Sequence, residues 1–314
     1  MRNYFILFTL FLCLTNVSFA QDEVKKNIVA TANDAAEKVS KIICDTTVKG
    51  KIWHIKNNLT LCTEQNMYTN WEAGGVSSFA FSVFYKGFYN YHKEKVKWDN
   101  SVELGYGKMR QDNNGKGIFD HGNKFRKSED KIELNSIIGY KAFDGWNYSA
   151  LINFKSQFDK GFKNDTLLVS DFFSPAYLTT SIGMEYKPRH FISILISPLA
   201  GRTTYIANKV LAKSGNFGLT EDTQIDFALG SYIKLFFEKD VFTNVNLLAK
   251  LEFFNDYEKV PFLTNTDINF EVFVNMKVNK YFSAFINLQT IYNYDFSKNI
   301  QFKERVGLSV PLDF

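Results

Sequence analysis

Cysteine, proline and long apolar runs are all scarce in this chain of 314 residues. It has 3 Cys and 5 Pro, and beyond its first twenty residues no stretch of about 18 apolar residues exists to make a membrane-spanning helix. Cys44 and Cys62 lack Cys-x-x-Cys spacing, which excludes the usual redox and zinc motifs. They either pair in an oxidising envelope or are two separate small apolar residues. A net charge of +4, without a basic cluster interleaved with aromatics, gives no case for a nucleic-acid partner.

The amino-terminal end has the features of an export signal. Arg2 precedes an apolar run from Phe5 to Leu14, and Ser18-Phe19-Ala20 supplies small residues for cleavage. We therefore expect a signal peptide over residues 1–20 and a mature protein that starts near Gln21. Residues 21–52 carry apolar side chains at helical spacing and form either a short amphipathic periplasmic helix or a loosely ordered lead-in.

From residue 53 onward, apolar and polar residues alternate over long segments. Aromatic residues make up 17% of the chain and Phe alone numbers 32. Alternation over residues 130–143, 146–158, 266–278 and 280–294 places one apolar and one polar face on each strand. The final strand, from Arg305 to Phe314, follows the same rule. A last strand that ends on Phe314 is typical of outer-membrane barrels, whose assembly machinery reads this end, so we expect that machinery and outer-membrane lipid as partners.

The breaks between these segments predict an up-and-down barrel. Short breaks near 91–95, 144–145, 187–190, 239–240 and 279–280 alternate with long ones near 64–75, 111–129, 159–175, 207–221, 256–265 and 295–299. This alternation of short and long breaks predicts an all-β, transmembrane, antiparallel barrel of about twelve strands over residues 53–314, with both chain ends on the periplasmic side. Pro198 and Gly201 inside one strand predict a bulge or a kink there.

Three blocks resemble a known family. They are Asn70-Trp-Glu-Ala-Gly-Gly75, Ser174-Pro-Ala-Tyr177 leading into Ser181-Ile-Gly-Met-Glu-Tyr-Lys-Pro188, and Ser197-Pro-Leu-Ala-Gly-Arg-Thr203. In these blocks, over roughly residues 53–314, the chain resembles an uncharacterised envelope family, the domain-of-unknown-function family numbered 3078. The resemblance implies an exported outer-membrane barrel and no assigned activity.

Two groups of residues are candidates for a functional site. The first is the loop motif Asn70, Trp71, Glu72, Gly74 and Gly75, which either shapes a turn or contacts a ligand or partner. The second is the set of charged side chains expected to face the lumen, where they either neutralise one another or tune a water-filled path. It comprises Lys97, Glu103, Lys131, Glu133, Lys155, Glu185, Asp226, Lys234, Lys250, Glu252, Glu271, Lys277, Lys303 and Arg305.

The sequence contains few residues that could form an enzyme active site. Only His121, beside Asp120 in a long loop, could act as the base of an outward-facing hydrolase. Asp112-Asn-Asn-Gly-Lys-Gly117 lacks the acidic spacing of a calcium loop, and no metal or cofactor motif stands out. We therefore expect no catalytic residues, metal or cofactor.

Three functions follow from this pattern. The first is a porin-like channel in the cell outer membrane of a Gram-negative envelope, for passive or gated passage of a small solute. The second is a non-conducting barrel that binds a surface or envelope partner, and the third is a loop-based hydrolase. Blockage of the lumen by residues 21–50 and the charged side chains would favour the binding functions over transport.

Overall fold

A computed structural model describes most of the chain from residue 52 onward. The described ranges are 52–68, 76–113, 116–163, 166–213, 217, 219–220, 222–259, 266–293 and 297–313. Four predicted features lie outside these ranges: the signal peptide, the lead-in segment over residues 21–51 together with Cys44, the loop motif Asn70–Gly75, and Phe314.

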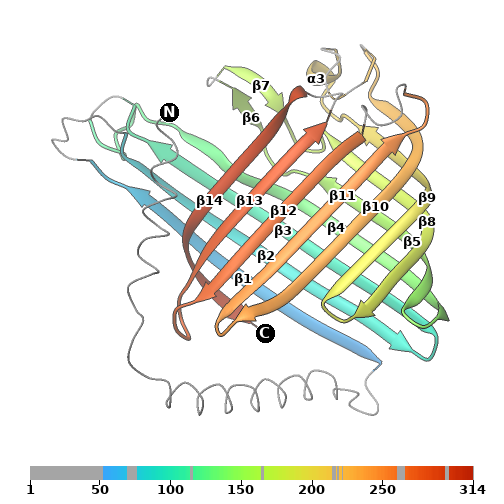
Figure 1. The fold of residues 1–314 in the computed structure, drawn as a ribbon. Coiled ribbons are helices and arrows are strands. Elements are labelled where there is room, and N and C mark those ends of the chain that lie inside the picture. Colours follow the sequence, from blue (N-terminus) through green and yellow to red (C-terminus); the bar gives the residue numbers. More distant parts are fainter. Residues whose placement is uncertain are drawn as a thin grey trace, which may run out of the picture. The chain divides into compact units, whose positions relative to one another are not determined.

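Twelve strands close into one antiparallel barrel (Figure 1). Each strand pairs with its neighbours in the chain, β5 pairs with β8, and β1 pairs with β14 to complete the ring. The predicted fold class is therefore confirmed. The barrel strands are β1 (Trp53–Asn66), β2 (Ser78–Lys93), β3 (Val96–Gln111), β4 (Phe125–Phe143), β5 (Trp146–Ser156), β8 (Ala176–Arg189), β9 (Ile192–Tyr205), β10 (Ile225–Phe242), β11 (Val245–Asp256), β12 (Thr266–Lys277), β13 (Ser283–Asn293) and β14 (Ser297–Asp313).

Alternation along each strand separates an apolar outer face from a polar inner one. On β5, Ile152 is 56% exposed on the outside, whereas the neighbouring Asn153 is 3% exposed inside the barrel. Ile182 on β8 and Val306 on β14 are likewise exposed on the outer face. A wall of exposed aliphatic side chains around a polar interior is the arrangement that a barrel in lipid requires.

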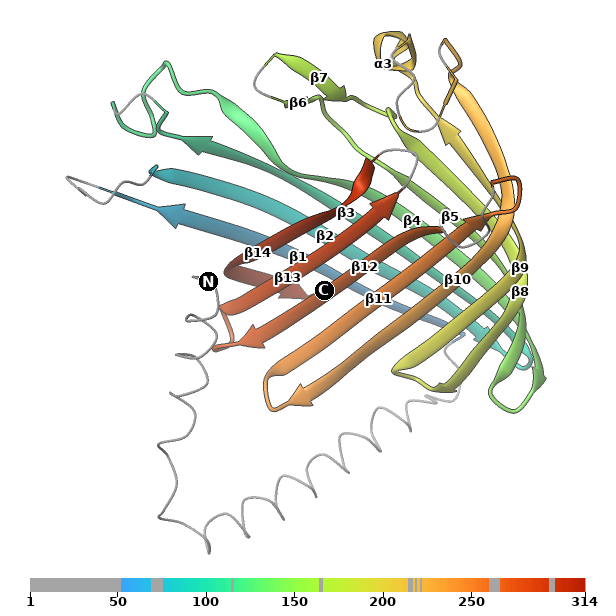
Figure 2. The ribbon, with the colours of Figure 1, turned by 45° about the horizontal axis from the view of Figure 1, so that its top comes forward.

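The side opposite the short turns carries additional structure. A small hairpin, β6 (Gly161–Lys163) with β7 (Leu167–Ser170), and a short helix, α3 (Lys209–Lys213), lie in two of the long loops (Figure 2). Leu211 and Ala212 of this helix are buried with Ile206 and Leu219 in a small apolar cluster. We call this the loop side of the barrel. None of these elements was predicted, because each spans at most two periods of its pattern, too few to distinguish it from a loop.

The short turns use residues that tolerate positive φ. Gly145 has a φ of 75° in the predicted Asp144-Gly145 turn, and Glu94 has a φ of 53° between β2 and β3. The turn predicted at Lys239-Asp240 was wrong. β10 continues to Phe242, and the chain reverses at Asn244, with a φ of 65°, because an Asn side chain tolerates this conformation.

Within the described ranges, no helix has the length and the hydrophobicity needed to cross a membrane.

The predicted bulge lies at Pro198. Between Ser197 and Ala200 the register of β9 shifts against β10, and it also shifts against β8 on either side of Gly183. The bulge brings the β9 backbone close to Gly183, so that a Cβ placed there would lie 2.1 Å from the carbonyl oxygen of Ile196. Only glycine fits this position without displacing the bulge.

We predict that Gly183→Ala lowers the free energy of unfolding by at least about 1–3 kcal/mol, because the added methyl group overpacks against backbone atoms. The yield of folded protein should fall accordingly. The measurement is the fraction of refolded protein whose unboiled form migrates differently from its boiled form on a detergent gel. Gly139→Ala is the matched control, since its Cβ would meet its nearest neighbours at an ordinary 3.5 Å. Equal folding yields for the two variants would contradict the steric role of Gly183.

Candidate functional site

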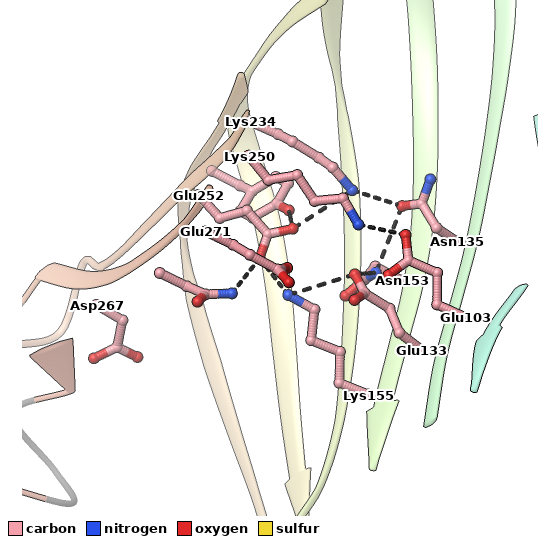
Figure 3. Close-up of polar contacts among 12 residues, drawn as sticks. Glu103, Glu133, Asn135, Asn153, Lys155, Lys234, Lys250, Glu252, Asp267 and Glu271 are labelled. Atoms are coloured by element: carbon pink, nitrogen blue, oxygen red, sulfur yellow. Dashed lines mark hydrogen bonds and ion pairs between the residues drawn. The ribbon is translucent and has the colours of Figure 1, made fainter. Parts of the chain in front are cut away.

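Eight charged side chains meet inside the barrel and form what we call the charged layer. Figure 3 labels all of them except Lys131. They come from six strands and comprise four carboxylates and four ammonium groups: Glu103, Glu133, Glu252 and Glu271 with Lys131, Lys155, Lys234 and Lys250. Glu103, Glu133, Lys234, Lys250 and Glu252 are each less than 10% exposed. The formal charges of the layer cancel, which is the condition for keeping so many of them away from bulk water.

Lys131 holds one half of the layer together. Its Nζ lies 2.8 Å from Glu103 Oε2, 2.9 Å from Glu133 Oε2 and 3.7 Å from Glu271 Oε2. Lys250 forms a further ion pair with Glu103. An ammonium group has three hydrogens to donate, so a three-carboxylate setting suits Lys131 better than a single partner would.

Glu252 organises the other half. It forms an ion pair with Lys155, lies 3.4 Å from Lys234 Nζ through Oε1, and accepts a hydrogen bond of 3.1 Å from the Tyr232 hydroxyl at the same atom. Lys234 also donates to the side-chain oxygen of Asn135 at 3.0 Å. These contacts bring together side chains from β4, β5, β10 and β11.

Two of the ion pairs join opposite walls of the barrel. Lys250 lies on β11 and Glu103 on β3, and in the ring these strands are separated by five others in either direction. The same holds for Lys131 on β4 and Glu271 on β12. Side chains from facing walls therefore meet in the middle of the lumen.

Three cavities border the charged layer. One of about 500 Å³ reaches toward β7 and the loop side, and Lys155, Glu252 and Tyr232 lie at its inner end. A second, of about 150 Å³, lies toward the short turns beside Asp99, Lys187 and His190. The third, of about 140 Å³, lies between β1, β14 and the layer. Among the described residues, charged side chains of the layer line all three cavities.

A second charged cluster lies on β14. Arg305 contacts Glu129 at 2.9 Å and Glu64 at 3.2 Å, and Lys303 contacts the same Glu129 oxygen at 2.7 Å. Glu129 belongs to β4 and Glu64 to β1, so this cluster also joins separate parts of the wall.

Lys127 holds the loop-side hairpin against the barrel. Its Nζ donates to Asp130 Oδ2 at 2.9 Å, to the carbonyl of Asp159 at 2.9 Å, and to the side-chain oxygens of Gln157 and Ser170 at 3.1 Å each. Gln157 and Ser170 also line the 500 Å³ cavity. Lys127 thus fixes part of the wall of that cavity.

Ten of the fourteen lumen-facing residues predicted from the sequence belong to the two charged clusters, and the other four lie elsewhere. Eight form the charged layer, and Lys303 and Arg305 form the β14 cluster. Glu185 accepts a hydrogen bond from the Ser193 hydroxyl at 2.7 Å, and Asp226 borders a small cavity near the start of β10. Lys97 and Lys277 lie near short turns and border none of the three cavities described above.

Several interior residues were missed by the sequence analysis. Lys86 borders the 140 Å³ cavity, and Glu129 belongs to a strand that begins earlier than the predicted residue 130. Arg202 pairs with Asp267 across the loop-side cavity, and Lys187 lies 3.2 Å from Asp99. Alternation of the apolar residues Phe79, Phe81 and Val83, continued along the same strand, would have found Lys86 on the opposite face. The partners of Arg202 and Lys187, in contrast, depend on how the ring closes.

The hydrolase candidate finds no catalytic partner in the described ranges. His121 is exposed in its loop, and no described serine hydroxyl forms a hydrogen bond with it. Asp112 Oδ2 instead accepts a hydrogen bond from the backbone N–H of Gly117 at 2.9 Å. That contact shapes the loop.

The closed ladder, the apolar outer face and the charged interior together define a transmembrane β-barrel of the outer-membrane type. Residues 63–162 match the model of a family described as "Protein of unknown function (DUF3078)". This is the family that the sequence resembles. The match contains the Asn70–Gly75 block, while the other two blocks lie beyond it. No curated protein sequence matches the chain.

Solved barrels align with most of the chain at low identity. The translocator domain of autotransporter NalP from Neisseria meningitidis shares 11% identity, with 91% of this chain and 97% of that chain covered and a TM-score of 0.37. The COG4313 outer membrane channel from Pseudomonas putida F1 shares 9% identity, with 84% and 98% covered and a TM-score of 0.39. OprB from Pseudomonas putida shares 10%, with 86% and 96% covered and a TM-score of 0.31. These values carry no argument about activity.

We predict that Lys250→Met lowers the free energy of unfolding by about 3–5 kcal/mol, because it leaves part of the charge of buried Glu103 uncompensated. The double variant Lys250→Met/Glu103→Gln should lose less, since it removes both charges of the pair. Urea unfolding in lipid vesicles, followed by tryptophan fluorescence, measures both. Lys141→Met, at an exposed pair with Asp144, should change nothing measurable. If the double variant were the less stable of the two, the pairing argument would be wrong.

We also predict that Lys127→Met frees the β6–β7 hairpin, because its hydrogen bonds to Ser170 of the hairpin and to Gln157 and Asp159 just before it are lost. Limited proteolysis of the folded protein should then cut between residues 157 and 172 several times faster than in the wild type. Lys124→Met, at an exposed position nearby, is the control. Unchanged cleavage in Lys127→Met would show that other contacts hold the hairpin.

Proposed function

We propose that this protein is an outer-membrane barrel that binds a small polar solute in its loop-side cavity and does not conduct ions while the charged layer is intact. The observation that carries the proposal is the pairing of Lys250 and Lys131 with carboxylates on the opposite wall. By the usual asymmetry of bacterial barrels, the long loops face the outside of the cell, so the cavity opens outward.

The layer opposes ion flow for an electrostatic reason. A cation or anion that crosses it must separate ion pairs that are buried in the lumen. Breaking one partner from a buried pair costs about 3–5 kcal/mol. An open pore instead keeps a hydrated path along rings of like charge or carbonyl oxygens. The mixed and internally neutral layer fits closure better than conduction.

The loop-side cavity has the size and chemistry of a binding site. Its 500 Å³ lies within the range of about 300–1,000 Å³ typical of small-molecule pockets. The cavity contains amides that donate and accept hydrogen bonds, an aromatic ring at Tyr177 and two ion pairs, Lys155 with Glu252 and Arg202 with Asp267. Because these charges are paired with each other, the cavity favours a neutral, hydrogen-bonding solute over an ion. The amides are Asn153, Gln157, Asn269, Asn293 and Gln301.

Gated passage of the solute is the second candidate. Cavities lie on both sides of the layer: Glu103, Glu133 and Lys234 line the one toward the short turns, and Lys155 and Glu252 line the loop-side one. Long Lys and Glu side chains can change rotamer, so a bound solute that replaced their partners could open a path.

Planar-bilayer conductance tests the closed state. We predict that the wild type gives no discrete current steps and that Glu103→Ala/Lys250→Ala produces them, because the variant removes a cross-wall pair at constant net charge. Lys108→Ala/Asp159→Ala is the matched control: it removes an ion pair of 2.7 Å from the loop side and should remain silent. Frequent current steps in folded wild-type protein would refute the closed state and favour an open channel.

A further inference from the structure

The loop-side cavity has hydrogen-bonding groups on two facing walls. Thr179 of β8 and Gln301 of β14 both line it. No described residue forms a hydrogen bond with the hydroxyl of Thr179 or with the side-chain amide of Gln301. In the ring, β8 and β14 are separated by five other strands in either direction. A ligand that satisfies both groups must therefore carry hydrogen-bonding atoms at two opposite ends.

Thr179 and Asn153 form a buried polar patch on one of these walls. The two residues are direct partners in the ladder between β5 and β8, and both line the cavity. Thr179 is 5% exposed and Asn153 3% exposed. Within the described ranges, the side-chain oxygen of Asn153 accepts no hydrogen bond. Buried polar groups are satisfied by water or by a ligand where the protein supplies no partner, so this patch points to a bound polar molecule.

Arg202 supplies further donors from β9. Its guanidinium group lies 3.9 Å from the centre of the Phe254 ring and forms an ion pair with Asp267. These two contacts fix the orientation of the group. A guanidinium has five N–H donors, so the pair with one carboxylate leaves donors for a hydroxyl group in the cavity. A neutral ligand can use these donors without breaking the ion pair.

Apolar surface lies between the polar groups of the cavity. The aromatic side chains of Tyr177 and Phe217 line it, and Tyr177 lies two residues before Thr179 on the same face of β8. Aliphatic lining residues add to this surface, namely Val169, Pro175 and Ile291. The ligand that fits such a lining has apolar faces and a polar perimeter. Sugar rings have this form, because their faces carry C–H groups and their hydroxyls point outward around the ring.

The charges around the cavity disfavour ionic ligands. Its described lining includes two cations and two anions, paired as Lys155 with Glu252 and Arg202 with Asp267. An ion would have to displace one member of a pair and leave the other uncompensated. Amino acids and short peptides carry charged ends, so they fit this lining poorly. Each hydroxyl of a sugar both donates and accepts, which matches the amides and the hydroxyl on the two walls.

We propose that the solute of the loop-side cavity is a short, neutral saccharide. This inference rests on the proposed function and names the class of its ligand. Hydroxyls at one end of the saccharide bind Thr179 and Asn153, hydroxyls at the other end bind Gln301, and the C–H faces of the rings pack on Tyr177. Because the polar groups lie on opposite walls, a trisaccharide binds more tightly than a single sugar, which reaches one wall at a time.

Saturation-transfer difference NMR of the full-length protein tests the ligand class. The protein is kept in an oligo-oxyethylene detergent, because a detergent with a sugar headgroup would compete. The probes are maltotriose, cellotriose, mannotriose, glucose, uridine and glycylglycine. We expect transfer to the C–H protons of at least one trisaccharide, less to glucose, and none to uridine or glycylglycine.

The other outcomes separate this inference from the function on which it rests. Transfer to uridine or glycylglycine that equals or exceeds transfer to every saccharide would overturn the saccharide assignment and leave the proposed solute site standing. No transfer to any of the probes would overturn both.

Two variants locate the bound saccharide. Thr179→Val and Gln301→Leu each remove hydrogen bonds with little change in side-chain volume, so each should raise the Kd of the best trisaccharide about two- to tenfold. Thr180→Val is the matched control, because Thr180 is the next residue of β8 and is exposed on the outer face. Folding of each variant is checked by its gel migration before and after boiling. Wild-type Kd values in folded Thr179→Val and Gln301→Leu would place the saccharide elsewhere and overturn the proposal.

Discussion

Backbone pairing in hydrocarbon is the constraint on which the rest of this structure depends. Lipid offers no hydrogen-bond partners, so a sheet in the membrane must close on itself and satisfy every strand from both sides. Closure fixes which residues face inward, because side chains alternate along each strand. The polar half of the sequence is thereby confined to a narrow interior, where its members must satisfy one another.

The charged layer follows from that confinement. Four carboxylates and four ammonium groups from six strands cancel in charge, and their mutual contacts join walls that the backbone ladder leaves far apart in the ring. The same ion pairs therefore neutralise the charges of the interior and hold the facing walls of the barrel together. A change that opens the layer also removes braces between facing strands, so permeability and stiffness are coupled. The bulge at Pro198 adds a local irregularity that the glycine at 183 accommodates.

Much of this architecture could be predicted from the sequence, and the remainder shows where periodicity stops being informative. Alternation over residues 266–278 and 280–294 indicated strands close to β12 and β13, and Pro198 indicated the bulge. The turn near Lys239 was misplaced because two charged residues look like a loop even when the strand continues to Phe242. The inward direction of Glu103 followed from its own strand, whereas its contact with Lys250, 147 residues away, depends on the cross-section of the closed barrel. Lys86 lay in a regular pattern and was overlooked. The β6–β7 hairpin and helix α3 of the loop side are too short to produce a recognisable sequence pattern.

The short ladder between β1 and β14 also has a consequence for how the barrel forms. It joins the two ends of the barrel sequence, and the Arg305–Glu64 contact above it closes a chain loop of 241 residues. Bringing such distant segments together costs more configurational entropy than forming any hairpin between adjacent strands. Among the described residues this ladder has six paired positions, fewer than the neighbouring ladders of the ring, so it contributes fewer backbone hydrogen bonds to offset that entropy. The ring should therefore close here last during assembly, and thermal fluctuations should open it here first.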